Sequence, residues 1–210
     1  MKIEYFGHAC FKITDKNGVS VVTDPYTGIG YELPENFSAD IVTVSHLHFD
    51  HNYIAGVSKN PQIITDIKPK TVNGIEIEGI ASWHDDKKGL FRGENRIYKI
   101  KADGITLCHL GDLGEEVSQT LVDKIGKIDI LCIPIGGTYT ITASQAKAYI
   151  EAIQPKMVIP MHYKTDDCTI NIADEKPFLR LFEDVKYGKN AIDIEEFTKD
   201  MQIVFMTREK

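Results

Sequence analysis

The most constraining feature of this chain is a six-residue segment, His46–His51, that contains three histidines and one aspartate. It directly follows an apolar, β-branched run with the character of a buried strand. Residues two apart in an extended segment point to the same side, so His46 and His48 can bind one cation. Asp50 and His51 are adjacent and point in different directions. They can bind a second ion or complete the first site from another side.

The residue types in this segment indicate which metal is bound. Neutral imidazole and carboxylate are the usual ligands of Zn²⁺, with Fe and Mn²⁺ as competitors. No cysteine lies nearby, which favours a site with an open position for water over a closed structural zinc site. The alternative interpretation is a polar loop that is rich in histidine by chance.

The overall composition is that of a soluble globular protein, with 42% hydrophobic and 26% charged residues in 210. We interpret residues 1–210 as one domain. The net charge of −7 argues against a general nucleic-acid surface, and no apolar run has the length of a membrane span. The four scattered cysteines and the lack of a secretory signal predict a cytoplasmic protein without disulfides. A small-molecule substrate is the expected partner, and the sequence leaves a homo-oligomer open.

Three further apolar runs are followed by residues of the types that commonly bind metals. His84 follows one of them and is predicted as the third imidazole of the first metal. A strand ending at Cys108 leads to Asp112, which lies between Gly111 and Gly114. A carboxylate between two cations offsets their repulsion, so we predict that Asp112 is a bridge. The run Met157–Pro160 leads to His162, the predicted last ligand of the second metal. Taken alone, each would be an ordinary surface, core or turn residue.

Four other side chains are candidates for supporting these ligands or lining the pocket. His8 is either a polar residue at a strand break or a pocket residue. Asp24 either caps a turn or accepts a hydrogen bond from a metal-binding imidazole. His109 either supports a ligand or merely ends a strand. Tyr163 either packs as an aromatic side chain or polarises a substrate oxygen. Lys164 either points to solvent or helps to polarise the same oxygen.

The segment Gly89 to Asn95 is predicted to form a mobile loop at the rim of the site. It contains Arg92, which either meets an anionic substrate or is solvated at the surface. The preceding Asp85 and Asp86 are interpreted as a solvated turn. A second long loop, residues 26–39, is rich in Gly and Pro, and such loops often border a site.

The hydrophobic pattern predicts sheet first and then alternating strands and helices. Helices are expected at residues 52–59, 117–125, 142–153 and 175–183, the third opened by a capping box. Strands are expected at residues 3–6, 11–14, 19–23, 41–45, 62–65, 96–101, 105–108, 129–134, 157–160 and 201–206. Residues 72–80 are expected to form a hairpin around Asn73-Gly74.

The ordered set His46-x-His48-x-Asp50-His51, His84, Gly111-Asp112 and His162 resembles the metallo-β-lactamase superfamily. The resemblance implies an α/β (α+β) fold, a four-layer αββα sandwich with the site at the edge where the sheets meet. It implies one metal on His46, His48 and His84, a second on Asp50, His51 and His162, and Asp112 as the bridge.

Further motifs resemble one branch of that superfamily, the small bacterial and archaeal metal-dependent hydrolases related to L-ascorbate-6-phosphate lactonase. These motifs are Gly7-His8, Asp24-Pro25, His109-x-Gly111-Asp112, Pro134-Ile135-Gly136 and Pro160-x-His162-Tyr163. Members often carry Asp at position 137 and Asn at position 164, where this chain has Gly137 and Lys164. Substrate contacts at those two positions are therefore not carried over.

The expected activity is a hydrolase that uses a metal-bound hydroxide on a small ester, lactone or phosphoester, with two divalent ions. Zn²⁺ is the first expectation, and Asp50 or Asp112 relays the proton. Three alternatives remain open. One is a diiron redox protein, although that class usually carries Glu at the position of His48. The others are a metal-bound binding or regulatory protein without turnover, and a nuclease.

Overall fold

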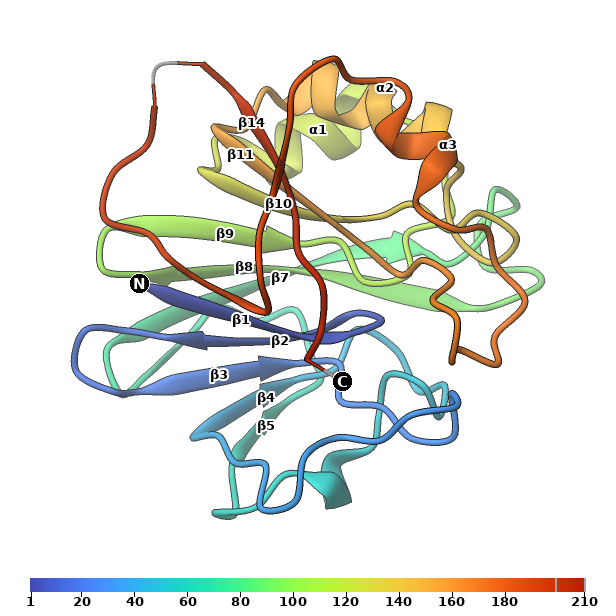
Figure 1. Ribbon diagram of the computed structural model, residues 1–210. Helices are drawn as coiled ribbons and strands as arrows, with labels where there is room; N and C mark the ends of the chain where they lie inside the picture. The colour runs from blue at the N-terminus through green and yellow to red at the C-terminus, as the bar shows by residue number, and fades with distance from the viewer. Residues whose placement is uncertain (199, 210) are drawn as a thin grey trace.

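The computed structural model describes residues 1–198 and 200–209, and within them the chain forms two mixed β-sheets that pack face to face (Figure 1). The first sheet has six strands in the order β13 (Ala191–Asp193), β1 (Lys2–Gly7), β2 (Cys10–Thr14), β3 (Ser20–Thr23), β4 (Ile41–Thr43) and β5 (Gln62–Ile64). The second has eight strands in the order β12 (Val185–Tyr187), β14 (Gln202–Phe205), β11 (Met157–Met161), β10 (Ile130–Pro134), β9 (Ile105–His109), β8 (Glu94–Ala102), β7 (Ile75–Trp83) and β6 (Lys70–Val72).

The main hydrophobic core lies between the sheets. Strands with one face in this core alternate in burial, as β7 does with its buried Ile75, Ile77 and Ile80. Strands covered on both faces are buried throughout, and β10 and β11 have no exposed residue. These parallel, fully covered strands read as continuous apolar runs, which is why the sequence predicts them well.

Helices cover the outer face of the eight-stranded sheet (Figure 1). They are α1 (Gln119–Ile125), α2 (Ala143–Ile153) and α3 (Lys176–Leu179). The predicted capping box at the start of α2 is confirmed, because Thr142 accepts from the backbone of Gln145 and the Gln145 side chain accepts from the backbone of Thr142. On these helices the buried side chains face the sheet, as expected for amphipathic segments.

The outer face of the six-stranded sheet is covered differently. The helix expected at residues 52–59 is wrong: only a 3₁₀ turn, η1 (Ile54–Gly56), forms there. This layer consists of η1 and loops that bury a second apolar cluster, which includes Tyr26, Ile29 and Phe37. The α/β sandwich expected from the sequence is thus observed, with its fourth layer made largely of loop.

The C-terminal part departs most from the sequence prediction. The helix expected at residues 175–183 is limited to the four residues of α3. Strands β12 and β13 were not predicted, because each has three residues and little buried surface. Strand pairing with β14 and β1 stabilises them, and that pairing leaves no local pattern in the sequence.

Both sheets contribute to the site through the ends of their strands. Strand β4 ends just before Ser45 and His46, and β7 ends just before His84. Strands β9 and β11 end just before Asp112 and His162. No helix in the described part of the chain combines the length and apolar character needed to cross a membrane.

Candidate metal centre

Six of the seven histidines in the chain lie in one cluster at an end of the sandwich. Three of them, His46, His48 and His84, form a group whose ligand nitrogens all lie within 4.8 Å of one another. His46 and His84 are buried and His48 is exposed. Their ring centroids are 4.6–5.1 Å apart, and the rings are turned at 52–87° to each other. Three imidazoles in this arrangement can surround one cation.

A second group combines histidines with a carboxylate. The ligand atoms of His8, Asp50, His51 and His162 lie within 4.8 Å of one another, and all four side chains are buried. His8 Nε2 and Asp50 Oδ2 are 3.1 Å apart, so His8 orients this carboxylate. His8 therefore belongs to the site, where the sequence left it open between a strand break and the pocket.

Asp112 lies between the two groups. Its Oδ1 is 3.2 Å from His51 Nε2, and its Oδ2 is 3.2 Å from His162 Nε2. The same Oδ2 is 3.5 Å from His84 Nε2 and 3.9 Å from His46 Nε2. One carboxylate thus faces imidazoles of both groups, as the sequence prediction of a bridging residue requires.

A hydrogen-bonded network beneath the cluster fixes the orientation of two imidazoles. His51 Nδ1 donates to Asp24 Oδ2 at 2.9 Å, and Ser45 donates to the same oxygen through its hydroxyl at 2.5 Å. Because the Ser45 hydroxyl proton is used there, its oxygen accepts from His46 Nδ1 at 2.9 Å. Asp24 is fully buried and thereby orients His51 directly and His46 through Ser45. Of the two sequence interpretations of Asp24, this geometry supports the hydrogen-bond acceptor.

This network leaves the metal-facing nitrogens without a partner. Nε2 of His46 and of His51, both ring nitrogens of His162 and Oδ1 of Asp112 are buried without a hydrogen bond. Unpaired buried polar atoms cost free energy, so native proteins rarely tolerate several in one place. Because His51 Nδ1 donates to Asp24, Nε2 of the neutral ring is an acceptor, and it lies 3.2 Å from a second acceptor, Asp112 Oδ1. The repulsion between these two atoms is relieved by a cation bound between them or by a proton on Nε2. The donor set therefore fits a metal centre.

The charge states of the groups agree with this reading. Burial and the neighbouring His51 lower the pKa of His46 to about 2, and burial lowers that of His8 to about 4, so both imidazoles are neutral near pH 7. Burial alone would raise the pKa of Asp112, but His162 and His51 hold it well below its usual range. Burial opposes protonation of His51, but Asp112 and Asp24 raise its pKa well above the usual value. The cluster thus stabilises positive charge beside Asp112.

Three of the site residues have backbone conformations that L-residues rarely adopt. The φ angles of His8, Asp24 and His162 are +53°, +40° and +52°. Such conformations cost of order 1 kcal/mol each and persist where the surrounding structure holds them. At Gly111, which has φ +55°, an added Cβ would lie 2.4 Å from the Asn95 side chain and 2.6 Å from that of Ser45. The backbone next to Asp112 is therefore in close contact with Asn95 and Ser45, and there is no room for a side chain at position 111.

Some predicted residues lie away from the cluster. Tyr163 is buried on the other side of His162, where its hydroxyl donates to the Met206 carbonyl at 2.9 Å, so the structure does not support its prediction as a pocket residue. The Lys164 ammonium donates to the Ile170 carbonyl at 2.7 Å. His109 lies beneath the site, with Nε2 2.8 Å from the Ala9 carbonyl oxygen, and its Nδ1 accepts from Gly111.

Several supporting residues were missed by the sequence analysis. Ser45 links His46 to Asp24, and Asn95 accepts from the backbone of Asp112 at 3.0 Å while donating to the Leu110 carbonyl. Asn95 is buried in strand β8. Ser45 lies just beyond strand β4, and Asn95 falls within the loop that the sequence predicted at residues 89–95, so the local sequence marked neither as a support.

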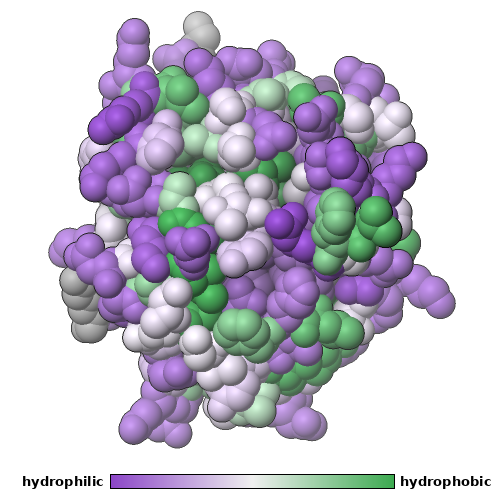
Figure 2. Space-filling view, turned by 90° about the vertical axis from the view of Figure 1, so that its right-hand side faces the viewer, coloured by the Kyte–Doolittle hydropathy of each residue, from purple (hydrophilic) through white to green (hydrophobic). Residues whose placement is uncertain are grey.

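A cavity of about 690 Å³ opens above the cluster, and His48, Asp50, His84 and Asp112 form part of its wall. Figure 2 views this end of the molecule and shows hydrophobic residues exposed among hydrophilic ones. The remaining wall comes from residues 47, 49, 92, 139 and 169–171. The last three were missed, because nothing in the local sequence marks them.

Comparison with known proteins identifies the family. The beta-lactamase superfamily domain model matches residues 2–162. A Thermotoga maritima crystal structure, assigned to the metallo-beta-lactamase superfamily as a Zn-dependent hydrolase, is 37% identical with a TM-score of 0.83, covering 98% of this chain and 97% of that one. A UPF0173 metal-dependent hydrolase of Thermococcus onnurineus is 30% identical over 79% of this chain and 85% of its own length. A UPF0173 metal-dependent hydrolase of Methanospirillum hungatei is 31% identical over 80% and 84%. The chain therefore belongs to the metallo-beta-lactamase superfamily.

Proposed function

We propose that this protein is a metal-dependent hydrolase with a dinuclear centre, Zn²⁺ being the first candidate for both ions. The observation that carries the proposal is the position of Asp112, whose two carboxylate oxygens face His51, His84 and His162 from both ligand groups. Relatives that are 30–31% identical over most of their length are described as metal-dependent hydrolases, which supports the same reaction class.

The ligand groups suggest how two ions would be shared. His46, His48 and His84 would hold the first, and Asp50, His51 and His162 the second, with Asp112 common to both. His8 would keep the Asp50 carboxylate in place, and Asp24 would keep the imidazole of His51 in the tautomer that presents Nε2. Bound divalent cations would lower the pKa of a water molecule and polarise the bond to be cleaved.

Two carboxylates of the chain would accept the proton that the attacking water molecule loses. Asp50 and Asp112 both line the cavity and both have a lowered pKa, so they are ionised near pH 7 and can accept a proton from water. For Asp50, burial works against ionisation, but the hydrogen bond with His8 and the neighbouring His51 together hold its pKa below the usual value. A small ester, lactone or phosphoester fits this chemistry, since each has an electrophilic centre that water attacks.

Metal removal and reconstitution test the proposal. The purified protein is analysed for Zn, Fe and Mn and then stripped with a chelator. It is reconstituted with one or two equivalents of each metal and assayed on esters, lactones, thioesters, phosphodiesters and phosphonates. We expect hydrolysis that is lost on stripping, returns with metal, and rises further with the second equivalent.

Two outcomes would contradict the proposal. Stable binding of two metal ions without hydrolysis across the panel would favour a binding or regulatory protein. Consumption of O₂ or NO by the iron-loaded form, without hydrolysis, would favour the diiron redox class.

A further inference from the structure

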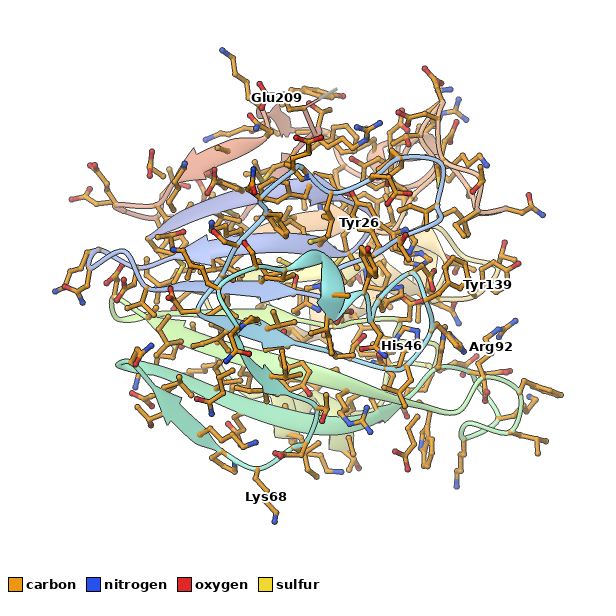
Figure 3. All side chains as sticks on the ribbon, turned by 90° about the horizontal axis from the view of Figure 1, so that it is seen from below. Tyr26, His46, Lys68, Arg92, Tyr139 and Glu209 are labelled. Carbon is orange, nitrogen blue, oxygen red and sulfur yellow. The ribbon has the colours of Figure 1, made fainter. Side chains whose placement is uncertain are left out.

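The cavity has an upper part that the proposed chemistry does not use. Beyond the metal-binding groups, its wall includes Leu47, Phe49, Arg92, Tyr139 and Ile170. These residues come from four separate loops. Figure 3 shows Arg92 and Tyr139 close together and toward the same end of the molecule as His46.

Arg92 supplies a positive charge to this wall. Its guanidinium donates to the Thr138 carbonyl at 3.0 Å and lies 5.6 Å from the ring centroid of Tyr139. Both contacts orient the group without neutralising it, because neither partner is an anion. Within the described residues no carboxylate forms a salt bridge with Arg92, whereas Arg96 pairs with Glu94 at 3.5 Å.

The loop that carries Arg92 is held by one buried carboxylate. Asp85 Oδ1 accepts from the backbone of Lys87 and Gly89, and Asp85 Oδ2 accepts from the backbone of Phe91 and Arg92, all at 2.8–2.9 Å. Asp85 was interpreted from the sequence as part of a solvated turn, and that interpretation is wrong because its side chain is buried. Arg92 is thus preorganised, which lowers the entropic cost of binding through it.

The same wall exposes apolar side chains. Leu47 and Phe49 alternate with the ligands of the His46–His51 segment, and 71% and 56% of their surface is exposed. Ile170 lies across the cavity on another loop. Large apolar side chains gathered around a concave site commonly contact an apolar part of a ligand.

We propose that the cavity selects amphiphilic anions: its substrate carries a carboxylate or phosphate that Arg92 binds and an apolar body that lies on Leu47 and Phe49. This inference rests on the proposed function for the cleaved bond, which would lie over the metal-binding groups. The planar guanidinium matches either oxyanion with paired hydrogen bonds, so both forms of the anion fit.

Direct binding tests the anion site without requiring turnover. The probes are hexyl phosphate and hexanoate, with hexanol as the neutral control, titrated calorimetrically into metal-free and metal-loaded protein. Arg92→Gln is compared with Lys87→Gln, which removes a positive charge from the same loop outside the cavity, where Lys87 pairs with Asp86. We expect Arg92→Gln to weaken binding of at least one anion about 10-fold or more in the metal-free protein, because a charge-assisted hydrogen bond is lost.

The comparison of the probes decides between outcomes. Equal anion affinity in wild type and Arg92→Gln would overturn the proposal. Equal losses in Arg92→Gln and Lys87→Gln would also overturn it, because they would indicate general electrostatic attraction. Whichever of hexyl phosphate and hexanoate binds with the higher affinity identifies whether the site prefers phosphate or carboxylate.

Hydrolysis of matched esters separates this inference from the proposed function. The pair is 4-nitrophenyl hexanoate and the mono-4-nitrophenyl ester of adipic acid, which differ by a distal carboxylate. We expect the ratio of kcat/KM for the anionic over the neutral ester to fall about 10-fold in Arg92→Gln and to be kept in Lys87→Gln. Hydrolysis with an unchanged ratio would refute the anion site alone. Arg92-dependent binding without hydrolysis of any tested substrate would refute the hydrolase alone.

Discussion

Two regions of the cavity differ in exposure: its floor, which includes His84 and Asp112 and lies on Asp24 and His51, is buried, whereas its rim is exposed. Asp24 and His51 have no exposed surface and share a 2.9 Å hydrogen bond, while more than half of the surface of Leu47 and Phe49 is exposed. The floor comes from strand ends of both sheets, and the rim comes from loops. The comparison suggests that the reaction type is set by the scaffold and the substrate choice by loops that can vary around it.

The largest effect is expected at the centre of the floor. Asp112→Asn keeps the shape of the side chain but removes the charge that both ligand groups face. We expect kcat/KM for hydrolysis to fall roughly 10³-fold, equal to about 4 kcal/mol of activation free energy, together with the loss of one metal equivalent. Steady-state kinetics and metal analysis check this. Near-normal activity with two metals bound would remove Asp112 from the mechanism.

The next largest effect is expected beneath the floor. Asp24→Asn disturbs the orientation of His51 and, through Ser45, of His46. We expect metal affinity to fall about 10- to 100-fold, as measured by competition with a chromophoric chelator. Asp40→Asn is the matched control, because Asp40 accepts from Ser20 in the same sheet and takes no part in the cluster. Equal losses in both variants would make the Asp24 effect one of general stability.

A smaller effect is expected at the rim. Each carboxylate oxygen of Asp85 accepts two backbone N–H groups. Asp85→Asn replaces one of these oxygens by an amide NH₂ group, which cannot accept, so the 86–93 loop loses two hydrogen bonds. We expect KM for anionic esters to rise about 5-fold, with faster proteolytic cleavage in the loop. Asp86→Asn is the control, because Asp86 is exposed and pairs only with Lys87 among the described residues. Identical behaviour of the two variants would show that Asp85 does not position Arg92.

The last prediction concerns a different quantity, the pH dependence of the free energy of unfolding. In the metal-free protein, burial lowers the pKa of His8 to about 4 and that of His46 to about 2, whereas the unfolded values lie near 6.5. The unfolded state therefore binds more protons between pH 6.5 and 4. The free energy of unfolding should fall as the pH is lowered through this window, by up to about 1.4 kcal/mol per pH unit for each imidazole. Urea unfolding at pH 6.5, 5.5 and 4.5 measures it.

The variant His8→Gln sharpens this last prediction. It removes one buried imidazole, so the slope of unfolding free energy against pH should become shallower. A flat profile in the wild-type protein would mean that the floor histidines are not held neutral.

The same division between floor and rim explains what could be predicted from the sequence. His46, His84, Asp112 and His162 each lie within three residues of the end of an apolar strand, so a local pattern marked them, and the structure brings them together. The roles of Ser45 and Asn95 depend on partners that are distant in the sequence, Asp24 and Asp112, and could not be read locally.

The fold follows a similar rule. Strands β10 and β11 are continuous apolar runs and were predicted nearly to the residue. The helix expected at residues 52–59 fails because the backbone of this segment bonds to distant loops: Tyr53 donates to the Pro25 carbonyl and Ser58 to the Phe37 carbonyl. Residues 169–171 reach the cavity through backbone pairing with Ile29, a contact without any sequence signal.

The C-terminal segment has a consequence for biosynthesis. Strand β13 completes the six-stranded sheet beside β1, whereas β14 and β12 extend the eight-stranded sheet beyond β11. A ribosome that has not yet released residues 185–205 therefore carries a nascent chain whose β1 and β11 still have unpaired edges. Such edges bind other extended chains. Chaperone protection of this protein would matter most before residues 185–205 have left the ribosome.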